Sequence, residues 1–227
     1  YYKTFMASQA AWHFFEKHIR ASSGLGASPL QNDPDRYDKR YAHCDVLVVG
    51  GGLAGLTAAL AAGRSGARVM LCDEQAEPGG WLLASDEIID GKPAAQWAEK
   101  ALADLAAMPE VTVLPRTTAF GYQDHDLVTL VERRGDHLPP ERAPVFRERL
   151  WRVRAKQVVL ATGAHERPLV FANNDLPGVM LAGAVATYVR RYAALPGRNA
   201  VVFTNNDAGY DAALALKSAG AAVRVVD

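Results

Sequence analysis

A glycine-rich turn between a strand and a helix constrains this sequence more than any other feature. Val46 to Val49 is a short apolar run, as a parallel strand buried on both faces requires. It leads into residues 50–55, Gly-Gly-Gly-Leu-Ala-Gly, which have the spacing G-x-G-x-x-G. In this motif the first glycine permits a tight turn, the second lets backbone N–H groups approach a pyrophosphate, and the third brings the helix close to the sheet. The stretch therefore predicts a phosphate-binding turn at a helix N-terminus.

The residues after the turn complete a βαβ unit. Val69 to Cys72 predicts the second strand, and Asp73 follows Gly52 by 21 positions. An acid about 20 residues after the turn typically accepts the ribose hydroxyls of a dinucleotide. Between the strands, small and apolar residues recur at helical spacing, and a glycine is placed to end the helix; these residues are Leu56, Ala59, Leu60, Gly63 and Gly66. The pattern predicts a dinucleotide site, and the alternative is a tight βα turn with nothing bound.

Composition argues against several classes of partner. Lys and Arg together number 25, as do Asp and Glu, so the charge pattern shows no footprint for nucleic acid or an anionic membrane. No run approaches the ~18 apolar residues of a membrane span, and the first residues lack a signal-peptide layout. We expect a cytoplasmic protein that binds neither nucleic acid nor membrane. Because the sequence does not begin with Met, we also expect residues upstream.

The two cysteines, Cys44 and Cys72, belong to no C-x-x-C pair. They are interpreted as small apolar filler in a reducing compartment. The two histidines of the N-terminal segment, His13 and His18, are five residues apart, which does not place them on one side of a helix. No metal site is predicted.

Residues 1–43 are expected to form an N-terminal helix and a connector. A helix is predicted from about Ser8 to Ser22, with one apolar face that must pack against another surface. Residues 27–43 are rich in Pro, Asp, Asn, Arg and Lys, which predicts a connector along the surface. The apolar face consists of Trp12, Phe15 and Ile19.

Residues 44–180 are expected to form the first dinucleotide-binding domain. A helix from Pro93 to about Met108 and a third parallel strand over Val111–Leu114 continue it. A small antiparallel β-meander is predicted within residues 118–154. A separate strand over residues 157–163 then returns to the first sheet, where Thr162 and Gly163 would lie beside the nucleotide.

Residues 181–227 are expected to form a linker helix and the start of a second, truncated Rossmann-like domain. Aligned on the first glycine turn, its second turn has Thr204, Asn206 and Gly209 at the three glycine positions. A side chain at Asn206 would stand where a pyrophosphate comes closest, so the second nucleotide site is predicted to be impaired. The predicted fold class is α/β: a Rossmann-like FAD/NAD(P)-binding fold with a parallel central sheet, a small antiparallel β-meander and an incomplete second βαβ nucleotide domain.

Several stretches taken together resemble the α subunit of heterotetrameric sarcosine oxidase. The resemblance covers nearly all 227 positions and implies a thioredoxin-reductase-type double nucleotide domain. It also implies NAD in the first nucleotide site, and FAD is the alternative there because both nucleotides share this half. The stretches are residues 12–16, 22–26, 40–46, the glycine turn, 161–168 and 203–207.

The same resemblance implies a multicofactor complex. Its partners would be β, γ and δ subunits, together with missing N- and C-terminal parts of the same chain. FAD would lie in the β subunit, FMN between α and β, and zinc in the δ subunit. The complex would oxidise sarcosine with oxygen and pass the one-carbon unit to tetrahydrofolate, giving glycine, hydrogen peroxide and 5,10-methylenetetrahydrofolate.

The motif and the resemblance together give a predicted cofactor site. The resemblance implies that an acid loop, residues 73–75, holds the adenosine half with Ala54 and a backbone group near Ala119. Asp73 and Glu74 would repel a 2′-phosphate, which favours NAD over NADP. Trp81 stands where relatives commonly have a small polar residue. The predicted cofactor-binding residues are Gly50, Gly52, Leu53, Ala54, Gly55, Asp73, Glu74, Gln75, Trp81, Ala119, Thr162 and Gly163.

No nucleophile–base set or carboxylate pair in this sequence predicts a catalytic centre. The redox chemistry is therefore expected elsewhere in the complex. His165 and Glu166 are the polar candidates nearest the ligand, with satisfied polar groups at a turn as the alternative reading. Two other functions stay open. One is an FAD-dependent pyridine-nucleotide oxidoreductase of the thioredoxin-reductase-like class, and the other is a non-catalytic assembly module stabilised by a nucleotide.

Overall fold

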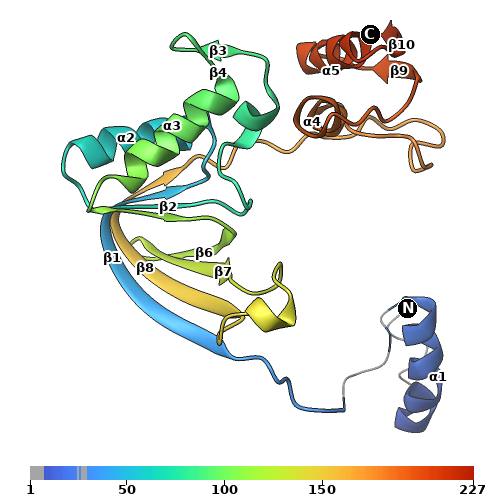
Figure 1. Cartoon of the computed structure of the whole chain (residues 1–227). Helices are drawn as coiled ribbons and strands as arrows, with labels where there is room; N and C mark the ends of the chain where they lie inside the picture. Colours follow the sequence, from blue (N-terminus) through green and yellow to red (C-terminus); the bar gives the residue numbers. More distant parts are fainter. Residues whose placement is uncertain (1–7, 25, 27–29) are drawn as a thin grey trace. The chain divides into compact units, whose positions relative to one another are not determined.

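A computed structural model describes residues 8–24, 26 and 30–227 of the chain, which divides into two compact units, residues 1–35 and 36–227. The first unit contains helix α1, Gln9–Ser22 (Figure 1), which begins as predicted. The Ser8 side chain caps it by accepting a hydrogen bond of 3.1 Å from the backbone N–H of Ala11. No residue of α1 is buried.

The second unit is built on one six-stranded sheet with the order β5-β2-β1-β8-β7-β6 (Figure 1). The first four strands in this order pair in parallel, and β7 and β6 add antiparallel pairs. The predicted parallel central sheet and antiparallel meander are therefore confirmed, but they form a single sheet. The strands are β1 Tyr37–Val49, β2 Val69–Cys72, β5 Val111–Leu114, β6 Thr117–Gln123, β7 Leu127–Arg133 and β8 Glu148–Leu160.

Two strand predictions were wrong at the same place. Residues 37–43, predicted as connector, are the first half of β1, and residues 148–160 form one strand, not a meander strand and a separate returning strand. The two long strands pair in parallel from Tyr37 opposite Glu148 to Val49 opposite Leu160. Charged residues are at least as frequent as apolar ones in both N-terminal halves, so only this long-range pairing makes them strands.

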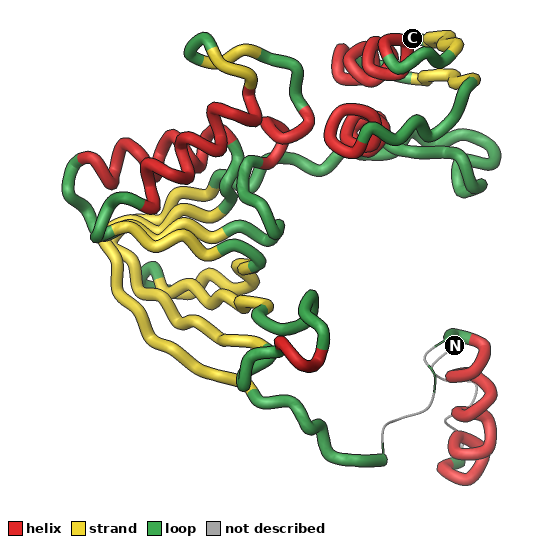
Figure 2. The backbone as a smooth tube through the Cα atoms, in the orientation of Figure 1, coloured by secondary structure: helices red, strands yellow, loops and turns green. Residues whose placement is uncertain are grey.

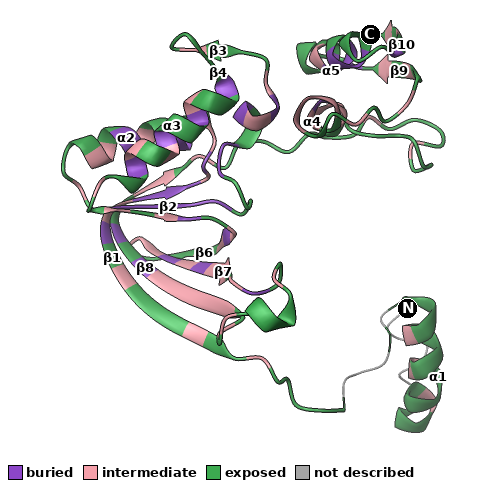
Figure 3. Cartoon of the chain, in the orientation of Figure 1, coloured by how far each residue is buried: buried purple, intermediate pink, exposed green. Residues whose placement is uncertain are grey.

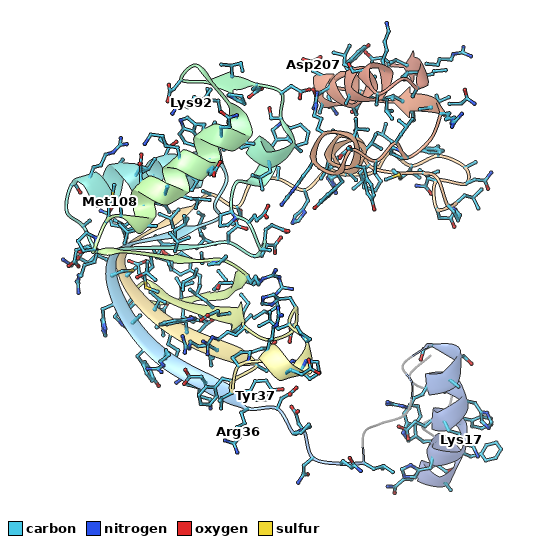
Figure 4. All side chains as sticks on the ribbon, viewed as in Figure 1. Lys17, Arg36, Tyr37, Lys92, Met108 and Asp207 are labelled. Carbon is cyan, nitrogen blue, oxygen red and sulfur yellow. The ribbon has the colours of Figure 1, made fainter. Side chains whose placement is uncertain are left out.

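The sheet is buried on both faces at its parallel end (Figure 3). Helices α2, Leu53–Arg64, and α3, Ala94–Ala106, cover one face, where Leu56, Leu71 and Leu105 are fully buried. The other face packs in a second cluster that includes Leu130 of β7 and Val153 of β8. Met108 lies just beyond the end of α3 (Figure 4), where its sulfur fills the space beside Gly63.

Short elements connect these layers. The 3₁₀ helix η1, Gly80–Ala84, follows β2 and leads to the small antiparallel pair β3, Ile88–Ile89, and β4, Lys92–Pro93. A second 3₁₀ turn, η2, Pro140–Arg142, lies in the charged loop before β8.

The C-terminal part forms a second βαβ unit, as predicted (Figure 2). Strands β9, Asn199–Phe203, and β10, Ala222–Val226, pair in parallel as a separate two-stranded sheet. Helix α5, Asp207–Ser218, joins them, and helix α4, Ala182–Tyr192, precedes them. In the described part of the chain no helix has both the length and the apolar character needed to cross a membrane.

Candidate functional site

The glycine turn joins the carboxyl end of β1 to the start of α2. Gly50 has φ +102°, a left-handed conformation that favours glycine, and its N–H donates a hydrogen bond of 2.8 Å to the Cys72 carbonyl. A Cβ at Gly50 would overlap the backbone of Ala161, and a Cβ at Gly55 would overlap the Gly50 carbonyl. These two glycines are therefore required by close backbone packing.

Gly52 differs from the other two glycines of the motif. It is the N-cap of α2, its backbone is extended, and no atom lies within 4 Å of the position that a Cβ would occupy. No side chain accepts a hydrogen bond at this cap. The backbone N–H groups in the first turn of α2 therefore have no capping side chain. The N-cap residue itself, Gly52, has no side chain that could block access to them.

Asp73 joins the end of β2 to the glycine turn. Its carboxylate is buried and accepts two backbone hydrogen bonds, one of 2.6 Å from the Gly51 N–H to Oδ2 and one of 2.8 Å from the Gln75 N–H to Oδ1. The structure therefore assigns this carboxylate a role in organising the turn, which the sequence analysis did not foresee. Because a carboxylate has about four acceptor positions, capacity for a further donor remains. The ribose contact stays a prediction.

The neighbouring glycine pair is a turn, as predicted. Gly79 has φ +149° and Gly80 has φ +53°. A Cβ at Gly80 would lie 3.2 Å from the Gly52 Cα, so this turn passes directly beside the glycine motif. Trp81 follows at the start of η1 and is about half exposed.

The end of β8 lies beside the same corner. The Ala161 N–H donates a hydrogen bond of 2.8 Å to the Val49 carbonyl, which places Thr162 and Gly163 just after it. Ala119, in contrast, lies in β6 and packs with the core on the sheet face opposite α2. Among the described residues, no hydrogen bond joins Ala119 or Trp81 to the glycine turn.

Of the two polar candidates beyond β8, Glu166 caps a helix. Its Oε1 and Oε2 accept hydrogen bonds of 2.8 Å each from the backbone N–H groups of Ala182 and Gly183, at the start of α4. The reading of Glu166 as a satisfied polar group is therefore confirmed. His165 is exposed.

The second βα turn is closed by its own side chains. Asn206 is the N-cap of α5, and its Oδ1 accepts a hydrogen bond of 3.0 Å from the Ala208 N–H. Thr204 Oγ1 donates to the Asn206 carbonyl at 2.8 Å, and its side chain fills the space beside Gly209. These contacts support the interpretation that a pyrophosphate has no access here.

Both cysteines are buried, which confirms their interpretation as core residues. Burial, with a smaller contribution from the charge of Asp73, raises the pKa of the Cys72 thiol to about 12. Burial also raises the pKa of the Cys44 thiol to about 11. Neutral buried thiols are not nucleophiles, so neither cysteine supplies chemistry to the site.

Sequence reasoning missed Arg133 and Arg116. Arg133 Nη2 donates a hydrogen bond of 2.8 Å to the carbonyl of Glu74, and the Arg116 N–H donates one of 2.9 Å to the carbonyl of Gln75. Arg133 lies 59 residues from its partner in the sequence, and no local pattern signals such a contact.

Comparisons with known proteins agree with this geometry. A model of the pyridine nucleotide-disulphide oxidoreductase family matches residues 44–227. The chain is 51% identical to sarcosine oxidase subunit alpha of Rhizobium meliloti (strain 1021) over its whole length, which is 23% of that relative. The predicted family resemblance is confirmed, and the chain spans about a quarter of the length of this relative.

Solved structures confirm the predicted fold class. L-Proline dehydrogenase from P. horikoshii superposes with a TM-score of 0.67 at 24% identity, covering 87% of this chain and 37% of that one. Lactococcus lactis thioredoxin reductase superposes with a TM-score of 0.57 at 21% identity, covering 80% of this chain and 55% of that one. At these identities the likeness concerns the fold alone.

Proposed function

Because this chain belongs to the pyridine nucleotide-disulphide oxidoreductase family, we propose that its first βαβ unit binds NAD as part of a sarcosine oxidase α subunit. The family supports nucleotide binding by an oxidoreductase fold. The similarity to sarcosine oxidase subunit alpha supports the more specific assignment.

One observation carries the proposal: α2 begins without a capping side chain, whereas both C-terminal helices are capped. Asn206 caps α5 and Glu166 caps α4, while α2 begins behind the open position at Gly52. Backbone N–H groups and the positive end of the helix dipole there suit a pyrophosphate, which no Cβ would obstruct. The residues present therefore fit the diphosphate of a dinucleotide.

The adenosine half would bind along the acid loop. Glu74 is exposed at the end of β2, and Asp73 retains acceptor capacity toward a ribose hydroxyl. Two adjacent carboxylates disfavour a 2′-phosphate, so NAD is preferred over NADP. The remaining residues of the proposed nucleotide-binding set are Leu53, Ala54, Gln75, Trp81, Ala119, Thr162 and Gly163.

The bound nucleotide would supply a hydride-accepting ring, or serve only as a tightly held structural ligand. This chain's own residues would bind its phosphates and orient its sugar. The chain would belong to a cytoplasmic complex with β, γ and δ subunits that carries FMN and FAD. This complex would oxidise sarcosine with oxygen and transfer the one-carbon unit to tetrahydrofolate.

An independent FAD enzyme that takes hydride from a second nucleotide is less well supported. It needs an accessible second turn, and the Asn206 and Thr204 side chains occupy that turn. FAD in the first site remains the alternative ligand because it shares the adenosine and pyrophosphate half with NAD.

Mass spectrometry of the small molecules released from natively purified protein tests the assignment. We expect NAD in stoichiometric amount, and release of FAD instead would favour the alternative ligand. Added NAD should also raise Tm, because a ligand that binds only the folded chain stabilises it by RT ln(1 + [L]/Kd). The proposal would be contradicted if the protein released neither nucleotide and if its Tm did not change when NAD or FAD was added.

A further inference from the structure

The acid loop that follows β2 is held by the strands of the meander. Three successive carbonyls of this loop each accept a hydrogen bond. The Asp73 carbonyl accepts from the Thr117 N–H at 2.7 Å, and the Gln75 carbonyl accepts from the Arg116 N–H at 2.9 Å. The Glu74 carbonyl accepts from Arg133 Nη2 at 2.8 Å, the only one of these three bonds that a side chain donates.

We propose that Arg133 is a positioning residue for the nucleotide site, acting through Asp73 on the glycine turn. The Glu74 carbonyl and the Gln75 N–H belong to the same peptide unit. Arg133 binds its carbonyl, and Asp73 Oδ1 accepts a hydrogen bond of 2.8 Å from its N–H. The other carboxylate oxygen of Asp73 accepts the 2.6 Å bond from the Gly51 N–H. A continuous chain of hydrogen bonds therefore runs from β7 to the glycine turn.

The planarity of the peptide bond makes this chain effective. Because C=O and N–H are fixed in one plane, a cation that holds the carbonyl also fixes the direction of the N–H. A hydrogen bond from an ionised donor polarises the peptide and strengthens the bond that its N–H donates. Without Arg133 this peptide would lose one of its two hydrogen bonds, and the Gln75 N–H would hold the Asp73 carboxylate toward Gly51 less firmly.

The backbone of Arg133 is itself fixed. Its N–H donates a hydrogen bond of 3.0 Å to the Arg116 carbonyl, and its strand pairs along its whole length with β8. The guanidinium therefore projects from an ordered strand and not from a free loop. This inference rests on the proposed function, since the nucleotide is the ligand that the ordered turn would receive.

The first test compares two arginine variants in the whole natural protein. Arg133→Met removes the bond to the Glu74 carbonyl, while Arg134→Met removes an equal charge from the adjacent residue, whose Nε lies 3.3 Å from Glu132 Oε1. In NAD titrations we expect Kd to rise roughly three- to tenfold for Arg133→Met, the usual effect of one lost hydrogen bond. Arg134→Met should stay within about twofold of wild type, and Arg133→Lys, which retains a donor, should recover part of the loss.

A double-mutant cycle tests whether the effect passes through Asp73. Asp73→Asn disturbs the two backbone bonds of the carboxylate, so Arg133→Met should weaken NAD binding much less in that background than in wild type. Equal effects of Arg133→Met in both backgrounds would mean that the two residues act independently, and would overturn the proposal.

A measurement without ligand separates this inference from the proposed function. Hydrogen exchange of peptides that cover residues 50–56 should be faster in nucleotide-free Arg133→Met than in wild type or Arg134→Met. If wild type binds neither NAD nor FAD, the proposed function fails, and the exchange result still decides the role of Arg133. Unchanged exchange in folded Arg133→Met or, should that variant not fold, in Arg133→Ala, which also removes the donor, would overturn the inference.

Discussion

Arg190 of α4 and Asp211 of α5 form a bidentate ion pair, with Nη1–Oδ2 and Nη2–Oδ1 distances of 2.7 Å each. The arginine side chain is largely buried, and its Nε also lies 2.6 Å from Asp86 Oδ2. This arginine therefore connects the second βαβ unit to the segment that follows η1. The adjacent Arg191 makes a similar ion pair with Glu77, but that carboxylate is exposed.

The two ion pairs should differ in their effect on stability. Asp211→Asn removes a charge from a largely buried partner and should lower the free energy of unfolding by about 1–3 kcal/mol. Glu77→Gln removes the exposed pair and should cost less than about 1 kcal/mol. Urea unfolding at neutral pH measures both, and equal losses would show that burial of Arg190 does not govern the difference.

The glycines of the motif should separate folding from binding. Gly55→Ala forces a Cβ into the Gly50 carbonyl and should destabilise the protein by at least about 1–3 kcal/mol. A Cβ at Gly52 would meet no atom within 4 Å, so Gly52→Val should keep a Tm close to that of wild type in the absence of ligand while losing nucleotide. Thermal melts with and without NAD give both results. If Gly52→Val retained as much nucleotide as wild type, the phosphate assignment would be wrong.

Asp45 should make stability depend on pH in the acid range. Hydrogen bonds from Arg68 and Lys156 hold the pKa of this carboxyl well below its usual range. Because its pKa is lower in the folded state, the Asp45 carboxylate stabilises the folded protein above the unfolded pKa of about 3.9. This stabilisation is lost as pH falls through the folded pKa. Asp45→Asn should therefore lower the urea midpoint at pH 6. The difference in urea midpoint between this variant and wild type should become smaller as the pH falls below 4. Asp175→Asn, at an exposed turn, serves as the control.

Neither cysteine should react with a thiol reagent in the native protein. Their raised pKa values, about 11 for Cys44 and about 12 for Cys72, leave almost no thiolate at pH 8, and both side chains are buried. Ellman's reagent should detect neither thiol in native protein and both in urea. Rapid reaction of either thiol without denaturant would contradict the packing described for the sheet.

Local patterns predicted the parts of the fold that depend on neighbouring residues. The strand, glycine turn and helix over residues 46–64 were identified because each signal lies within one turn or strand of the next. The first half of β1 and the continuity of β8 were missed because their strand character comes from pairing between residues 111 positions apart. Charged residues there resemble a solvated connector until the partner strand is known.

The candidate site shows the same division. The sequence identified Gly50, Gly52 and Asp73 from their spacing alone, and the structure brings them together. It did not reveal that Asp73 binds the Gly51 N–H, nor that Arg133 reaches the acid loop, because side-chain direction and contacts between distant strands follow from tertiary packing. The identity of the nucleotide depends on its other half, which this motif does not contact.

The pairing of β1 with β8 has a consequence for synthesis of the chain. While β8 is still unsynthesised, the glycine motif already exists, but one neighbour of its strand has not been made. Contacts between such distant segments form late and slowly. The emerging polypeptide therefore exposes an unpaired strand edge until residue 160 leaves the exit tunnel.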